Sequence, residues 1–147
     1  MRDKIMTGAV IGLLADAVKL AVNYLAFLLK FTPIVFWQIT ASRFLEKKDL
    51  SQPLAFVIGA VADLFTSAFL GVLFLYMTRY IGKKYLLLKG LGFGILVWVA
   101  LFGTVLRQTG IILKLDATSI AVTMIAHAVY GVAIGFFTGL LDKEKVR

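Results

Sequence analysis

The stretch MTGAVIGLLADAVKLAVNYLAFLL, residues 6–29, decides the fold of this chain. A helix needs about 20 predominantly apolar residues to cross a bilayer, and this stretch is long enough. Asp16, Lys19 and Asn23 are its polar interruptions. It exceeds the roughly 7–15 apolar residues of a secretory signal and lacks a small-x-small cleavage site. We therefore expect it to remain in the protein as a first transmembrane helix.

The whole chain has the composition of a protein dissolved in lipid. Of its 147 residues 61% are hydrophobic and 16% charged, and the mean hydropathy is +0.93, whereas soluble domains are about 45–50% apolar and about 25% charged. The length allows four spans with short connections and leaves no room for a separate soluble domain. The sequence predicts an all-α membrane protein, residues 1–147, with four transmembrane helices. The spans are expected at about 6–29, 53–77, 86–106 with a possible extension to 113, and 119–141.

The connection between the first two spans is too short and too polar to span. Thr32 fits an N-cap and Pro33 a first helical position, and apolar and polar residues then fall on opposite faces of a helix. The apolar positions are Ile34, Trp37, Ala41, Phe44 and Leu45, and the polar ones are Gln38, Ser42, Glu46 and Asp49. We expect an interfacial amphipathic helix at about 33–48, with Trp37 at headgroup depth. A re-entrant segment that dips toward the polar centre stays open as the alternative.

The net charge of +8 is read as a topology signal. Lys and Arg cluster at the ends of apolar segments, where the positive-inside rule and anionic lipid headgroups account for them without nucleic acid. Nine of them lie before the first span, between the second and third, and in the tail; six lie in the other two connections. We expect both termini in the cytoplasm, and anionic headgroups at the basic turn 79–89.

Small residues at four-residue spacing predict close helix packing, because helices in lipid associate through small residues rather than by burying large apolar ones. The first span carries such a row before Asp16, the second carries one around Asp63, and the fourth carries the longest, after His127. The row positions are Gly8, Gly12, Gly59, Ser67, Gly71, Gly131, Gly135 and Gly139. They are read either as packing seams or as the surroundings of a site where the spans meet.

Three spans bring polar groups to one depth. At 1.5 Å per residue, Asp16 and Asp63 lie about 15 Å inside opposite edges and His127 about 12 Å inside, near the midplane of a core of roughly 30 Å. Charges at this depth cost about 2.5–3.5 kcal/mol each and should pair inside the bundle. Lys19 is the local partner expected for Asp16, and Asn23 continues the same stripe.

For Asp63 the candidate partners are His127, or Arg107 if the third span extends far enough; alone, Arg107 is expected to snorkel to the interface. The cluster of Asp16, Lys19, Asn23, Asp63, His127 and Arg107 is either a structural network that fixes helix register or a proton or ion path.

Other chemistry finds no support in the residues. There is no cysteine, and one histidine cannot hold a metal alone, so no metal, disulfide or cofactor is expected. Gly90, Gly92 and Gly94 lack the G-x-G-x-x-G spacing and the preceding strand of a dinucleotide site. No serine has a histidine and an acid at a spacing suited to a catalytic triad. Enzymatic hydrolysis is therefore not supported.

Two stretches resemble a group of small four-helix membrane proteins of Gram-positive bacteria that has no assigned activity. They are residues 84–94, KYLLLKGLGFG, followed by Trp98, and residues 127–131, HAVYG, followed by Gly135. A looser match covers Gly12 and Lys19 in the first span. The resemblance implies a bacterial plasma-membrane location and the four-helix architecture, and it brings no catalytic residues.

Two functions lead, and a lipid-modifying enzyme is a distant third. The first is a structural or accessory membrane protein that self-associates or joins another membrane protein, because the small-residue rows exceed what four helices need among themselves. The second is a small proton- or ion-coupled transporter or channel centred on the intramembrane cluster.

Overall fold

The computed structural model describes residues 3–105 and 115–143 of the chain. Its helices are α1 (Lys4–Leu28), α2 (Phe36–Ala41), η1 (Lys47–Asp49), α3 (Pro53–Ile81), α4 (Leu86–Trp98), the π-helical turn η2 (Val99–Val105) and α6 (Ala117–Leu141). Four helices are long and apolar enough to cross a membrane: Lys4–Leu28, Pro53–Ile81, Leu86–Gly103 and Ala117–Leu141. Within the described residues they confirm an all-α chain with four helices able to span a membrane, and they indicate a multi-pass membrane protein. Residues 106–113, the possible extension of the third span, lie outside the described residues.

The outer surface of the bundle is apolar. Large side chains such as Phe65, Phe69, Leu96 and Phe136 are more than half exposed, while the ionisable side chains of Asp16, Lys19, Asp63 and His127 are buried. This inverted distribution is what a lipid solvent favours, since a charge facing the hydrocarbon would have no partner.

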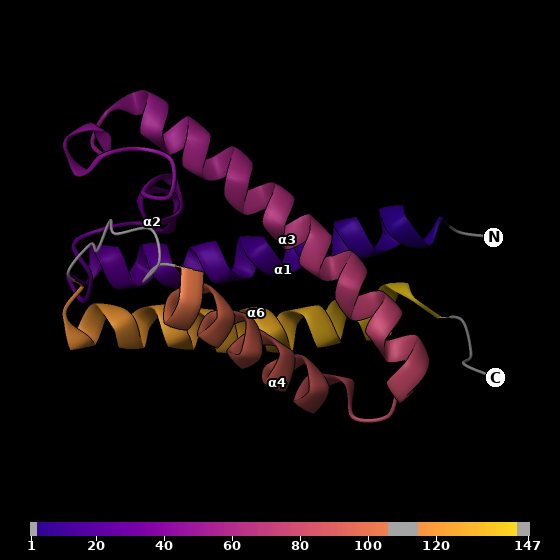
Figure 1. Cartoon of the computed structure of the whole chain (residues 1–147). Coiled ribbons are helices and arrows are strands. Elements are labelled where there is room, and N and C mark those ends of the chain that lie inside the picture. The colour runs from indigo at the N-terminus through magenta and orange to yellow at the C-terminus, as the bar shows by residue number, and fades with distance from the viewer. Residues whose placement is uncertain (1–2, 106–114, 144–147) are drawn as a thin grey trace.

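The helices form two close pairs that meet along α1 and α6. α4 packs along α6, α3 packs against α1, and α1 runs beside α6. Figure 1 shows α1 and α6 antiparallel, with α3 crossing over α1 and α4 lying on the other side of α6. The start of α1 and the end of α6 lie at one end of this bundle (Figure 1). The membrane side on which they lie stays a prediction.

Glycine permits both pairs to form. A Cβ on Gly12 would collide with the carbonyl oxygen of Ser67 in α3, and one on Gly71 would collide with that of Gly8 in α1. The α4–α6 seam repeats the pattern: a Cβ on Gly94 would strike the His127 carbonyl, and one on Gly135 would strike the Leu86 carbonyl. Because the helices touch backbone to backbone, the polar side chains between them are held at short range.

One carboxylate ties together three helix ends. Asp142, which directly follows α6, is buried; its carboxylate lies 3.3 Å from Nζ of Lys4, 3.6 Å from Arg79 and 2.8 Å from Nζ of Lys83. Nearby, Nζ of Lys89 donates to the carbonyls of Ile81 and Gly82. Three basic side chains around the turn 79–89 thus stabilise helix ends. Binding of anionic headgroups there stays a prediction.

The predicted helix 33–48 differs from what the structure shows. α-Helix covers only Phe36–Ala41, and a turn and η1 follow it. Ser42, expected on the polar face, is buried, and Phe44, expected on the apolar face, is 63% exposed. The hydroxyl of Ser42 donates to the carbonyl of Ile39 at 2.6 Å, which satisfies the hydroxyl inside the protein. The helical period therefore stops too early to generate the predicted faces.

Changing Gly94 to Ala tests the backbone contact between α4 and α6. The added methyl meets the His127 carbonyl, so we expect Gly94→Ala to lower the free energy of unfolding by about 1–3 kcal/mol. Gly92→Ala is the matched control on the same helix, because a Cβ at Gly92 meets nothing within 4 Å and alanine favours helix. Denaturation in detergent micelles measures both, and equal stability of the two variants would contradict the packing.

Asp142 predicts a pH dependence of stability. Burial acts to raise the pKa of Asp142, but hydrogen bonds and charge from Lys83 and Lys4 outweigh it and hold the pKa below its ordinary value, which is about 3.9. The stabilisation is therefore present above about pH 4 and is lost as pH falls through the lower folded pKa. We expect Asp142→Asn to cost about 1.5–3 kcal/mol at neutral pH and to flatten the acid limb of a thermal-unfolding series.

Candidate functional site

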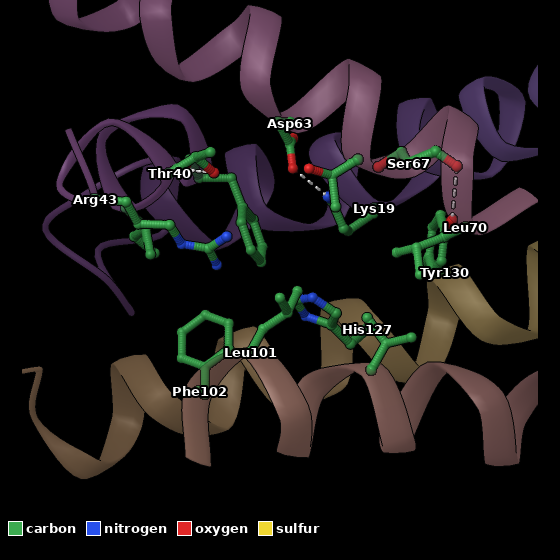
Figure 2. A pocket seen from close by; sticks show the side chains of 14 residues that line it. Lys19, Thr40, Arg43, Asp63, Ser67, Leu70, Leu101, Phe102, His127 and Tyr130 are labelled. Atoms are coloured by element: carbon green, nitrogen blue, oxygen red, sulfur yellow. Dashed lines mark hydrogen bonds and ion pairs between the residues drawn. The ribbon is translucent and has the colours of Figure 1, made fainter. Parts of the chain in front are cut away.

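The centre of the bundle holds an ammonium shared by two carboxylates. Nζ of Lys19 lies 2.6 Å from Oδ1 of Asp16, one turn earlier in α1, and 2.8 Å from Oδ1 of Asp63 in α3. All three residues are buried, with Asp16 0%, Lys19 4% and Asp63 6% exposed. Asp16 is twelve residues from either end of α1, so the triad lies about 18 Å from both ends of that helix. Figure 2 shows the ammonium of Lys19 directed at the carboxylate of Asp63.

Neighbouring groups fix the triad in place. The hydroxyl of Ser67 donates to Oδ1 of Asp16 at 2.8 Å, and the hydroxyl of Tyr130 donates to the Ser67 carbonyl at 3.2 Å. Nζ of Lys19 also lies 4.8 Å from the centre of the Phe36 ring and 5.8 Å from that of Tyr130. The ammonium thus has both ionic and cation–π partners, as a desolvated cation requires.

The carboxylates are only partly satisfied. Oδ2 of Asp16 and Oδ2 of Asp63 have no hydrogen-bond partner among the described residues. A buried carboxylate oxygen without a donor is costly, so the site holds unused acceptor capacity. Such groups mark positions at which a proton, water or ligand can be accepted.

A small cavity adjoins Asp63 and Lys19. Its volume is about 20 Å³, enough for one water molecule. It lies between α1, α2, α3, α4, η2 and α6, and each of them contributes to its wall. The polar lining residues are Lys19, Thr40, Arg43, Asp63, Thr66, Ser67, His127 and Tyr130. Figure 2 shows Arg43 and His127 pointing into this space from different elements.

The structure gathers most of the predicted polar cluster, with one change of partner. Asp63 was expected to pair with His127 or Arg107, but its ion pair is with Lys19, because the close approach of α1 and α3 puts Asp63 within reach of the same ammonium that binds Asp16. His127 lines the cavity instead, and its Nδ1 lies 2.9 Å from the Thr123 carbonyl. Arg107 lies outside the described residues.

Asn23 was expected to belong to the polar cluster of Asp16 and Lys19, but in the structure its side chain binds the backbone of α2. Its Oδ1 accepts a hydrogen bond from the backbone N–H of Phe36 at 2.8 Å. A Cβ on Gly59 in α3 would collide with the Trp37 carbonyl. Asn23 is about 8 Å from the end of α1 and Gly59 about 9 Å from the start of α3. Together they hold α2 between the spans, below the ends of both.

Two cavity residues from this connection escaped the sequence analysis, Thr40 and Arg43. Phe36, Ile39, Thr40 and Arg43 all line the cavity, at the spacing i, i+3, i+4, i+7 of one helix face. That face combines an aromatic ring with a hydroxyl and a guanidinium, and its spacing can be recognised in the sequence. It was missed because residues 33–48 were divided into an apolar and a polar face, and the polar face was assigned to other positions.

The predicted glycine rows are used within the chain. Backbone groups of a neighbouring element face Gly8, Gly12, Gly59, Gly71, Gly131 and Gly135, and Gly139 faces the Leu86 side chain at 3.4 Å. These rows therefore leave no small residues in excess of what packing within the chain uses, although such an excess was the reason for expecting self-association. Self-association itself stays a prediction.

Comparison with protein families matches residues 2–147 to DUF6789, a family of unknown function. The chain belongs to this family. The searches of curated proteins and of solved structures found no match to this chain. The DUF6789 match confirms that the chain is a member of an uncharacterised family, whereas an origin in Gram-positive bacteria stays a prediction.

The charge count of the triad predicts an order of stabilities. Lys19→Met leaves two buried carboxylates facing each other, and we expect it to cost about 3–5 kcal/mol. Asp63→Asn keeps the Asp16–Lys19 pair with balanced charge, so it should cost less. Unfolding of both variants in mixed micelles measures the order. A Lys19→Met protein as stable as Asp63→Asn would show that the Lys19 ammonium does not compensate the charge of two buried carboxylates.

Proposed function

We propose that this DUF6789 protein translocates protons across the membrane and that Asp16, Lys19 and Asp63 form its proton-binding centre. The observation that carries the proposal is the shared ammonium: one cation lies between two carboxylates, and each carboxylate keeps one oxygen without a partner among the described residues.

The proposal follows from charge balance. With all three groups ionised the triad carries one excess negative charge at the centre of a span, where a net charge is costly. One proton on either carboxylate makes the triad neutral. Two carboxylates this close, with one counter-ion between them, favour holding one such proton. When the triad gains or loses that proton, its net charge changes, and with it the electrostatic attraction between α1 and α3.

The dimensions of the cavity favour a proton over a larger solute. About 20 Å³ admits one water molecule and excludes a hydrated metal cation. Among residues 3–105 and 115–143, no three His, Cys, Asp or Glu side chains are grouped to hold a metal ion.

Among the described residues, the packing around the centre differs between its two sides. On the side of the chain termini, Ile11, Phe74 and Ile134 fill the bundle with no exposed surface. On the opposite side the cavity wall is made by Thr40 and Arg43 of the connection. We propose that residues 31–45, which contain the cavity residues Phe36, Ile39, Thr40 and Arg43, form a re-entrant segment through which protons reach Asp63. Release on the termini side then requires α3 to move relative to α1 at the Gly12–Ser67 contact.

Proton flux into liposomes tests the proposal. Purified protein is reconstituted in vesicles that hold a pH-sensitive dye, and a membrane potential is imposed. We expect the wild type to acidify the lumen, and we expect Asp63→Asn and Asp16→Asn to reduce the rate to that of empty vesicles, because neither variant retains the second carboxylate that binds the proton.

Asp49→Asn is the matched control, since it makes the same change at a residue of η1, outside the spans and the cavity. It should conduct like the wild type. Tight vesicles that hold folded wild-type protein would refute the proposal and return the structural or accessory role, with its search for a membrane partner, to first place.

A further inference from the structure

His127 is the single histidine of the chain, and its surroundings determine which of its nitrogens carries hydrogen. The side chain is 3% exposed. Its Nδ1 lies 2.9 Å from the carbonyl oxygen of Thr123. A carbonyl can only accept, so Nδ1 must be the donor of this bond. In the neutral imidazole the other nitrogen, Nε2, then carries a lone pair and no hydrogen.

Nε2 has no hydrogen-bond partner among the described residues, although the ring is held firmly. The Phe36 and Phe102 rings contact the imidazole, with centroid distances of 5.4 Å and 5.6 Å. With Nδ1 bound to Thr123, the ring keeps one orientation. Figure 2 shows this ring directed toward the space beside Lys19 and Asp63. A fixed acceptor therefore faces the water-sized cavity.

The cavity wall contains enough polar groups to bind a water molecule. A buried water needs two to four polar partners. The wall supplies the ammonium of Lys19 and the carboxylate of Asp63. It also supplies two hydroxyl oxygens that stay free to accept, because Thr40 and Thr66 donate their hydrogens to carbonyls of their own segments.

We infer that one water molecule in this cavity bridges the Lys19–Asp63 pair to Nε2 of His127, and that His127 is the second proton acceptor of the site. This inference rests on the proposed function. In the transfer, an O–H bond of the water breaks as the Nε2–H bond forms, and the water regains a proton from the Asp63 carboxylic acid. Asp63 is left ionised, His127 becomes imidazolium, and the total charge is unchanged.

Charged groups from every side of the cavity act on this transfer. Ionised carboxylates stabilise a proton on His127, whereas the nearby cations oppose it. Movement of the proton to His127 leaves Asp63 ionised and thereby offsets the repulsion. Within the described residues, the titratable side chains facing this region are Asp16 and Lys19 of α1, Arg43 of the connection, Asp63 of α3 and Tyr130 of α6.

Nitrogen NMR of ¹⁵N-histidine-labelled protein in lipid bilayers tests the inference. The spectrum holds one histidine, so its assignment needs no mutants. At neutral pH we expect a pyrrole-type Nδ1, a pyridine-type Nε2, and magnetisation transfer from water to His127. Asp63→Asn should shift the Nε2 resonance, and Asp49→Asn should leave it unchanged. A hydrogen on Nε2, or no contact with water, would overturn the inference.

Flux gives the second readout. His127→Gln keeps a polar side chain of similar reach but has no basic nitrogen, and we expect it to lower the proton flux by a factor of roughly 100. If the wild type conducts and His127→Gln conducts at the same rate, the inference falls while the proposed function stands. If wild-type vesicles are tight but the NMR shows water at Nε2, the proposed function falls and the water site stands.

Discussion

The Lys19 ammonium sets the constraint that the rest of the bundle meets. A cation at the middle of a span needs anions within reach, and Lys19 receives one from its own helix and one from α3. The second anion arrives only because α1 and α3 cross with their backbones in contact at Gly12 and Ser67. Glycine packing and charge pairing therefore depend on each other. The glycine contact brings α1 and α3 close together, and the Lys19–Asp63 ion pair requires that close approach.

Much of this was predictable because lipid imposes simple rules. Four apolar stretches of sufficient length could only be spans, and a charge at mid-span had to face the interior, so Asp16, Lys19 and Asp63 were identifiable as a set. The sequence could not specify which acid would reach Lys19 from another helix. That choice depends on the crossing of α1 and α3, which a single sequence does not encode in any local pattern. Asp63 was accordingly expected to pair with His127 or Arg107, whereas among the described residues its ion pair is with Lys19.

The first connection was harder to predict for a related reason. Amphipathic spacing assigns residues to an inside and an outside, but α2 has protein on several sides. The backbone of Phe36 is held by Asn23 and that of Trp37 meets Gly59, two contacts made by residues distant in sequence. A buried hydroxyl such as Ser42 defeats a polar-face argument when it bonds to its own backbone. Tertiary contacts therefore overrode the local period, and Arg43 was overlooked with it.

The π-helical turn η2 (Val99–Val105) determines where the third span could lose one residue and still keep its packing against α6. A π turn holds one residue more than an α turn, and such turns recur at functional sites. The indole of Trp98, just before it, donates to Thr123, and Leu101 and Phe102, both within it, line the cavity. Losing one residue here would restore plain α geometry and leave the glycines that precede the turn in register with α6. The same deletion between Gly90 and Gly94 would turn one glycine about 100° away from α6. The third span is thus tolerant of a shorter sequence at one place and intolerant along its glycine seam.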